Sequence, residues 1–181
     1  MNIKMILLIT LSAVVLFLGI GLYQASQLTS IRITQSVTID AGQQEVFNMV
    51  RYLENFPKWS PFLVADPGQH YEVSGNDGQI GARYHWIGSE GKEKDTGFQE
   101  IVKIDDLQYI GMQCDIQAPF EAHPSFEYHF ANSPEGTKVT QDFTLKSGLV
   151  DAFFLWLFGV KKQMENTNAQ GMQLLKQAVE A

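Results

Sequence analysis

The chain has 181 residues, a formal net charge of −7 at pH 7 and a single cysteine. The negative balance argues against a nucleic-acid partner and against electrostatic attraction to anionic lipid. One cysteine excludes an intramolecular disulfide and a cysteine-rich zinc site.

The chain begins with an uncharged apolar segment, Met5–Tyr23, and a helix needs about 20 such residues to cross a bilayer. A secretory signal peptide is the alternative, but its apolar core spans only about 7–15 residues. The best cleavage site, Tyr23-Gln24-Ala25, also has a bulky ring where a small residue is required. We therefore expect an uncleaved single-pass anchor after a short flank, residues 1–4. Lys4 precedes the span, which predicts a cytoplasmic N-terminus and an extracytoplasmic domain.

Residues 24–30 are polar and predict a linker to one domain, residues 31–181. Ile31–Ile39 alternates apolar and polar residues, which is typical of a half-buried strand. Asp40-Ala-Gly-Gln43 then matches a capping box that starts a helix. Two prolines further on interrupt regular helix, so we expect two short helices after the first strand.

The rest of the domain predicts a run of strands and one closing helix, Asp151–Val179. A curved antiparallel sheet needs one face covered, and a single long helix can lie across it. We expect the space between them to exceed what side chains fill, leaving a cavity of several hundred Å³. The predicted strands are Gln69–Ser74, Ala82–Gly88, Thr96–Asp105, Leu107–Ala118, His123–Asn132 and Thr137–Leu145.

Six motifs in this order resemble the SRPBCC superfamily, the START/Bet v 1-like helix-grip proteins. The bacterial group labelled polyketide cyclase/dehydrase and lipid transport is the most similar, although proline is usual there at Gly42 and leucine at Met172. The resemblance implies an α+β helix-grip fold with a hydrophobic ligand cavity under the long helix. It implies no shared catalytic set. The motifs are Ile39–Phe47, Asn55–Phe62, Gly81–Gly88, Ala118–Phe120, Gly136–Thr140 and Gly171–Lys176.

Alternation along the strands turns an aromatic-rich set of side chains toward the helix. Such rings form plain core in many proteins, whereas the resemblance favours a ligand pocket. Inward amides either bond to backbone and water or orient a ligand's polar head. The predicted ligand-binding residues are Gln35, Trp59, Tyr84, Trp86, Phe98, Met112, Phe126, Tyr128, Gln141, Phe143, Phe153 and Leu157.

We expect no catalytic residue, metal ion or cofactor. Glu100 is a candidate general base if it shares the pocket face, but a carboxylate at the rim is the more usual arrangement. The four histidines lack metal-ligand spacing, and no nucleophile or dinucleotide motif is present. Cys114 is expected to act as a small hydrophobic residue.

The start of the closing helix, Asp151–Val160, is apolar on all sides. Phe154, Trp156 and Phe158 cannot face the sheet together with Phe153, because a helix buries one face. Either loops cover the extra face, or it forms a patch that contacts the membrane or a partner, or lines a ligand portal.

The sequence thus predicts membrane-tethered binding, with a role in transport or sensing, of a small hydrophobic or lipid-like ligand. Two alternatives stay open. One is a cyclase- or dehydratase-type enzyme that uses the same cavity. The other is an interaction module with a filled core.

Overall fold

The computed structural model describes residues 2–91, 95–118 and 120–181, so Pro119 of the predicted Ala118–Phe120 motif lies outside the described residues. Its centre is a seven-stranded antiparallel sheet in the order β1-β7-β6-β5-β4-β3-β2. The first strand therefore pairs with the last. The strands are β1 Ser30–Ile39, β2 His70–Ser74, β3 Arg83–Ile87, β4 Thr96–Asp105, β5 Tyr109–Ala118, β6 Ser125–Ser133 and β7 Gly136–Lys146.

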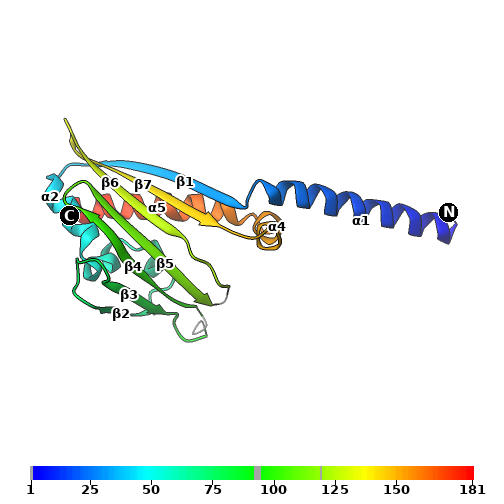
Figure 1. Cartoon of the computed structure of the whole chain (residues 1–181), viewed down its shortest axis with the longest axis horizontal. Coiled ribbons are helices and arrows are strands. Elements are labelled where there is room, and N and C mark those ends of the chain that lie inside the picture. The colour runs from blue at the N-terminus through cyan, green and yellow to red at the C-terminus, as the bar shows by residue number, and fades with distance from the viewer. Residues whose placement is uncertain (1, 92–94, 119) are drawn as a thin grey trace.

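One long helix lies against this sheet, and a second extends away from it (Figure 1). The helices are α1 Ile3–Ser26, α2 Gln43–Arg51, the 3₁₀ helix η1 Leu53–Lys58, α3 Pro61–Ala65, α4 Leu149–Leu157 and α5 Val160–Glu180. The domain is the predicted α+β helix grip, with short helices after the first strand and a long C-terminal helix. Because α1 continues to Ser26, only residues 27–29 separate it from β1, fewer than the predicted linker 24–30.

The prediction of one closing helix over Asp151–Val179 is wrong. The helix breaks between α4 and α5, where Gly159 adopts φ +63°, a left-handed conformation that ends a helix at little cost for glycine. As a result, α5 packs on the sheet while α4 turns to α1. The apolar residues of α4 therefore pack against α1, whereas those of α5 pack against the sheet.

The predicted capping box is also wrong, although the helix it was meant to start is present. Gly42 is the N-cap of α2, and no side chain caps this end. The side chain of Gln43 instead donates to the carbonyl oxygens of Leu107 at 2.6 Å and Phe130 at 3.2 Å. This amide ties α2 to the sheet.

The main apolar core fills one end of the space between the sheet and its helices. It joins the buried faces of α2 and η1 to the inward residues of the strands. Val46, Phe47 and Val50 are almost fully buried there. A second, smaller apolar cluster contains Ile31, Ile33, Phe143 and Leu145, and the candidate site borders both clusters.

Candidate functional site

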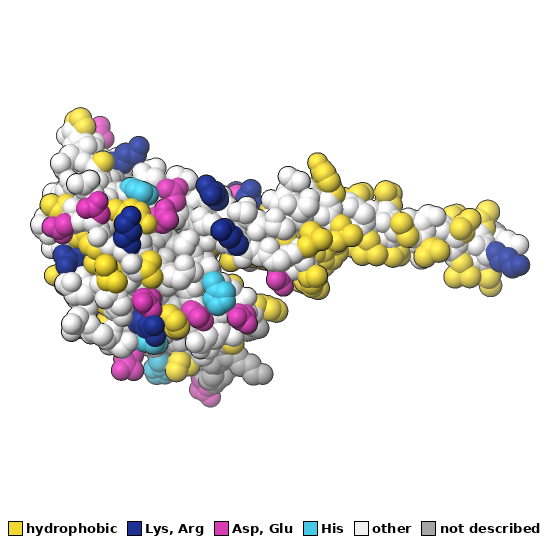
Figure 2. All heavy atoms as spheres, in the orientation of Figure 1, with side chains coloured by type: hydrophobic (Ala, Val, Ile, Leu, Met, Phe, Trp, Pro, Cys, Tyr) yellow, Lys and Arg dark blue, Asp and Glu magenta, His cyan; other side chains and the backbone are white. Residues whose placement is uncertain are grey.

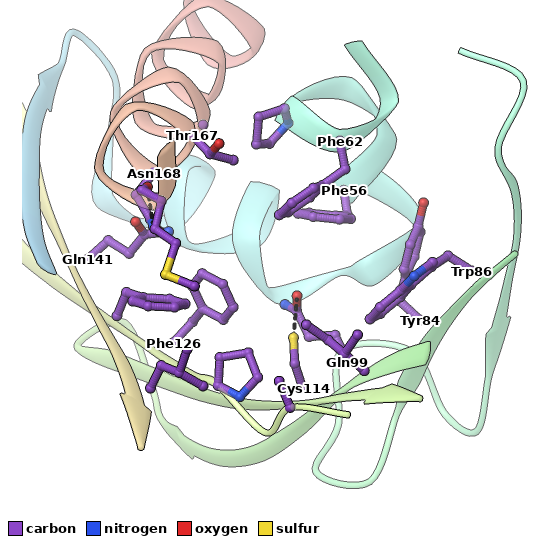
Figure 3. A pocket seen from close by; sticks show the side chains of 18 of the residues that line it. Phe56, Phe62, Tyr84, Trp86, Gln99, Cys114, Phe126, Gln141, Thr167 and Asn168 are labelled. Carbon is purple, nitrogen blue, oxygen red and sulfur yellow. Dashed lines mark hydrogen bonds between the residues drawn. The ribbon is translucent and has the colours of Figure 1, made fainter. Parts of the chain in front are cut away.

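A cavity of about 350 Å³ lies between the inner face of the sheet, α3 and the first half of α5 (Figure 3). Its wall is mainly apolar, because alternate residues of the strands turn large side chains inward. The apolar lining includes Phe56, Phe62, Trp86, Ile116, Phe126, Phe143, Leu145 and Met164.

Half of the residues predicted to bind ligand line this cavity. They lie on β3, β6 and β7, where alternation alone identified the inward face. These residues are Tyr84, Trp86, Phe126, Tyr128, Gln141 and Phe143.

Three other predicted residues point toward the sheet–helix interface but do not line the cavity. Trp59 and Met112 are buried in the filled core, where the Trp59 ring lies edge-on to Tyr128 with centroids 6.1 Å apart. Gln35 faces a separate polar hollow between β1 and α5, next to Lys162 and Glu165.

Phe98 lies on the opposite face of the sheet from the cavity, so its predicted inward orientation is wrong. The Arg83 guanidinium stacks over its ring at 4.6 Å, and Glu100 on the same face pairs with Arg83 at 2.7 Å. The alternate residues of β4 face inward instead: Gln99 and Ile101 are buried, and the Trp86 ring lies over Gly97, where a side chain would collide with it. Gln99 therefore faces the cavity and Glu100 does not.

Phe153 and Leu157 lie on α4 and are outside the cavity, because the helix breaks after them. The Phe153 ring packs against Phe17 of α1, with centroids 6.5 Å apart. Leu157 is 43 % exposed. Their spacing would place both side chains on the sheet-facing side of α5 only if α4 and α5 formed one unbroken helix.

The cavity wall carries several polar groups, and sequence patterns missed some of them. The Cys114 thiol donates to Gln99 Oε1 at 3.6 Å, and Gln141 Nε2 donates to Tyr128 Oη at 3.0 Å. Among the described residues, Tyr84 Oη and Gln141 Oε1 are buried without a hydrogen-bond partner. Such orphaned atoms are uncommon in folded proteins.

Burial keeps the thiol of Cys114 and the phenols of Tyr84 and Tyr128 in the wall neutral. It raises the pKa of the Cys114 thiol to about 12. It also raises the pKa values of Tyr84 and Tyr128 above their ordinary value. All three are therefore protonated at neutral pH, so they offer hydrogen-bond donors rather than bases.

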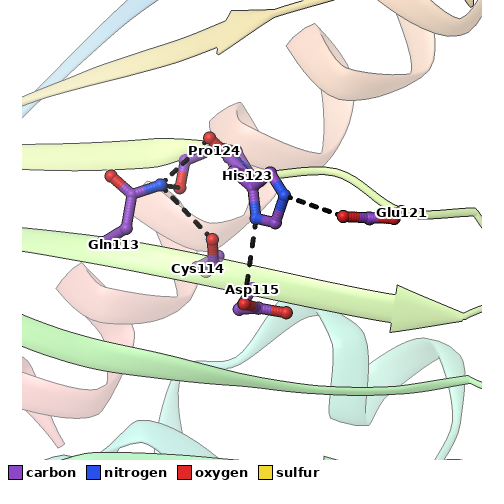
Figure 4. Close-up of polar contacts among 6 residues, drawn as sticks. All are labelled: Gln113, Cys114, Asp115, Glu121, His123 and Pro124. Carbon is purple, nitrogen blue, oxygen red and sulfur yellow. Dashed lines mark hydrogen bonds and ion pairs between the residues drawn. The ribbon is translucent and has the colours of Figure 1, made fainter.

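A polar cluster braces the cavity wall from outside (Figure 4). Gln113 Nε2 donates to the carbonyl oxygens of Cys114, His123 and Pro124. The His123 ring lies between the carboxylates of Asp115 and Glu121. These contacts hold the segment before β6 against β5. Within residues 2–91, 95–118 and 120–181, no three His, Cys, Asp or Glu side chains are arranged to hold a metal ion.

The fold and the hollow between sheet and helix define a helix-grip protein of the SRPBCC, Bet v 1-like class. The chain belongs to the polyketide cyclase / dehydrase and lipid transport family, whose sequence profile matches residues 30–180. None of the curated proteins shows significant sequence similarity to it.

Solved structures share the fold at low sequence identity. A Chromobacterium violaceum protein, CV1439, superposes with a TM-score of 0.60 at 12 % identity, covering 84 % of this chain and 98 % of its own. Ara h 8.0201 gives 0.56 at 15 %, covering 83 % and 97 %. The di-domain ARO/CYC protein BexL gives 0.57 at 16 %, covering 84 % of this chain and 50 % of BexL. These likenesses concern the fold alone.

Proposed function

We propose that the protein holds a small hydrophobic or lipid-like ligand in the cavity between the sheet and α5 while α1 anchors it in a membrane. The cavity carries the proposal. Its volume of about 350 Å³ falls within the range of about 300–1,000 Å³ that is usual for ligand sites. Its apolar wall with a few polar groups also fits such a ligand. The description of the family includes lipid transport, which agrees with a lipid-like ligand.

Binding rather than catalysis is the function we propose. A cyclase or dehydratase needs a positioned acid or base in the site. Glu100 lies on the other face of the sheet, bound to Arg83, which leaves Asp95 as the one carboxylate among the described residues of the wall. The buried Cys114, Tyr84 and Tyr128 are held protonated and so cannot act as bases. The enzyme alternative would be favoured by turnover of an aromatic polyketide by the purified protein.

The anchor is proposed from the composition and exposure of α1. Of the described helices, α1 is the one long and apolar enough to cross a membrane. Its large apolar side chains are exposed along its length (Figure 2). Burying them in hydrocarbon stabilises by about 25 cal/mol per Å². We place residues 5–23 in the bilayer, residues 1–4 in the cytoplasm and the domain on the other side, as Lys4 suggests.

Packing between α1 and α4 supports a retained anchor over a cleaved leader. A side chain at Gly21 would collide with the Phe153 ring and lie 2.9 Å from Trp156 Cζ3. The Phe17 and Trp156 rings are 5.7 Å apart. Removal of α1 would expose the Phe153 and Trp156 rings to water.

The cavity end nearest α4 is proposed as the entrance for the ligand. Leu145, Val160 and Met164 line this part of the cavity, and α4 directly precedes α5. The Phe154 ring on α4 and the Phe158 ring directly after it are exposed and stacked on each other. This surface continues the apolar surface of α1 (Figure 2). We place it at the membrane interface, so that an apolar ligand enters without crossing water.

Lipid contact at α4 can be tested by fluorescence quenching. Full-length protein in nanodiscs of neutral phosphatidylcholine is compared with protein in brominated phosphatidylcholine, which quenches tryptophan on contact. The Trp156→Phe variant identifies the part of the emission that comes from Trp156. We expect that part to be quenched. If it is unaffected by bromine, α4 does not contact lipid.

Ligand binding is tested by native mass spectrometry of the full-length protein extracted gently from its own membranes. The proposal predicts a mass increment in the wild type. Thr167→Trp should abolish it, because Thr167 lines the cavity and a larger side chain would fill it. Gln173→Trp, at an exposed position of the same helix, is the control and should retain it. An increment that Thr167→Trp leaves unchanged would place the ligand elsewhere.

A further inference from the structure

The cavity wall contains a hydrogen-bonding atom that the described residues leave unsatisfied. The Gln141 side chain is almost fully buried and its Nε2 donates to Tyr128 Oη at 3.0 Å. Its Oε1 has no partner among the described residues. Figure 3 shows Gln141 at the side of the cavity away from Tyr84, the other residue with an orphaned buried atom. A buried polar atom without a partner is uncommon in a folded protein, and in the wall of a cavity a ligand can supply the missing hydrogen bond.

The charge of the wall limits what that ligand can be. No lysine, arginine or histidine is among the described residues that line the cavity, and the one charged side chain among them is Asp95. The described part of the wall would offer a carboxylate or phosphate head no counter-charge, and such a head would face a like charge at Asp95. Burial of an unpaired charge costs far more than burial of a hydroxyl that finds a partner.

A hydroxyl group fits Gln141 in either orientation of its amide. It can donate to Oε1 as the structure places it, or accept from Nε2 if the amide is rotated and Tyr128 donates to Oε1. We propose that the ligand is an uncharged, largely apolar alcohol whose hydroxyl binds Gln141 and whose apolar part lies along Phe126, Phe143 and Met164. This inference rests on the proposed binding function and names its ligand class.

The test compares two probes that share a chain and differ in the head group. Thermal unfolding of the full-length protein in a neutral detergent is followed with increasing dodecan-1-ol or dodecanoate, at about pH 8, where a carboxylic acid is ionised. A ligand that binds the folded state raises the midpoint temperature. We expect dodecan-1-ol to reach the half-maximal shift at about a tenfold lower concentration than dodecanoate.

Three variants test whether the preference for dodecan-1-ol over dodecanoate arises in the cavity. Gln141→Leu should weaken the effect of the alcohol about tenfold. Gln35→Leu is the matched control and should leave the effect of the alcohol unchanged. Gln35 pairs with Gln141 across β1 and β7 but lies outside the cavity. Thr167→Lys adds a cation to the wall and should shift the preference toward dodecanoate.

The outcomes separate this inference from the proposed function. A wild type that responds equally to both probes, or better to dodecanoate, overturns the inference and leaves a ligand cavity. An unchanged alcohol response in Gln141→Leu overturns the role of Gln141. A wild type that responds to neither probe, just as Thr167→Trp does, contradicts both proposals.

Discussion

At the scale of single residues, the turn between β6 and β7 shows how one position holds three strands in place. Gly136 has φ +114°, a conformation that side chains rarely adopt. A Cβ atom there would also collide with the carbonyl oxygen of Ile39, at the end of β1. Gly136 closes the Ser133-Pro-Glu-Gly136 turn, a place where glycine supplies the positive φ at no steric cost. The close approach of β1 depends on tertiary packing and could not be predicted.

Replacement of Gly136 by alanine is expected to lower the free energy of unfolding by more than about 2 kcal/mol, since backbone strain and a backbone clash add. Gly81→Ala separates the two effects. Gly81 also has a positive φ, +89°, but nothing lies within 4 Å of its Cβ position. We expect about 1 kcal/mol there. Denaturant unfolding of the two variants checks this, and equal losses would contradict the clash.

The neutral thiol of Cys114 gives a second residue-scale prediction. Burial raises its pKa from 9.0 to about 12, so native protein well below pH 9.0 holds about a thousandfold less thiolate than unfolded chain. Alkylation by iodoacetamide should be slower in proportion. Because folding favours the protonated thiol, its contribution to stability is complete below pH 9.0 and falls as pH rises toward 12. Alkylation as fast as in urea would contradict a buried thiol.

At the scale of elements, periodicity predicted the strands well, because alternation is imposed by a sheet with one buried face. It predicted which residues of β5, β6 and β7 turn inward. It failed on β4, where either of the two alternating sets of side chains could have been the set that faces inward. The aromatic ring of Phe98 favoured the set that contains Phe98. In the structure, Trp86 occupies the space over Gly97, and the set that contains Gln99 turns inward. That choice depends on a neighbouring strand.

The break between α4 and α5 was missed for a related reason. Gly159 within an apolar helical pattern is compatible with a continuous helix. What favours the break is the packing surface that α1 offers to Phe153 and Trp156. A local pattern cannot show where such a partner lies.

The contact between α1 and α4 can be tested with two glycines of the same helix. Gly21→Leu should separate the helices, because its side chain would occupy the position of the Phe153 ring. Gly19→Leu should have no effect, because nothing lies within 4 Å of that position. Spin labels on α1 and α4 of the full-length protein measure the separation. An unchanged distance in Gly21→Leu would contradict the close packing.

At the scale of the whole molecule, family resemblance and strand order together predicted the helix-grip architecture and the cavity. Resemblance could not show which polar groups of the wall stay unpaired. That depends on side-chain geometry, as in the bond from Gln141 to Tyr128 that leaves the amide oxygen free. Nor could it show that only residues 27–29 separate α1 from β1. With α4 docked on α1, this short connection limits how far the domain can tilt relative to α1.

The central claim is that an apolar ligand occupies the space between the sheet and α5. Photo-crosslinking tests it most directly. Full-length protein in neutral nanodiscs is irradiated with diazirine analogues of dodecan-1-ol and dodecanoate, and labelled peptides are identified by mass spectrometry. We predict labels on the segments that carry Phe126, Phe143 and Met164, which line the cavity, and their loss in Thr167→Trp. Labels confined to α1 and α4, with the cavity segments unlabelled by either probe, would contradict the claim.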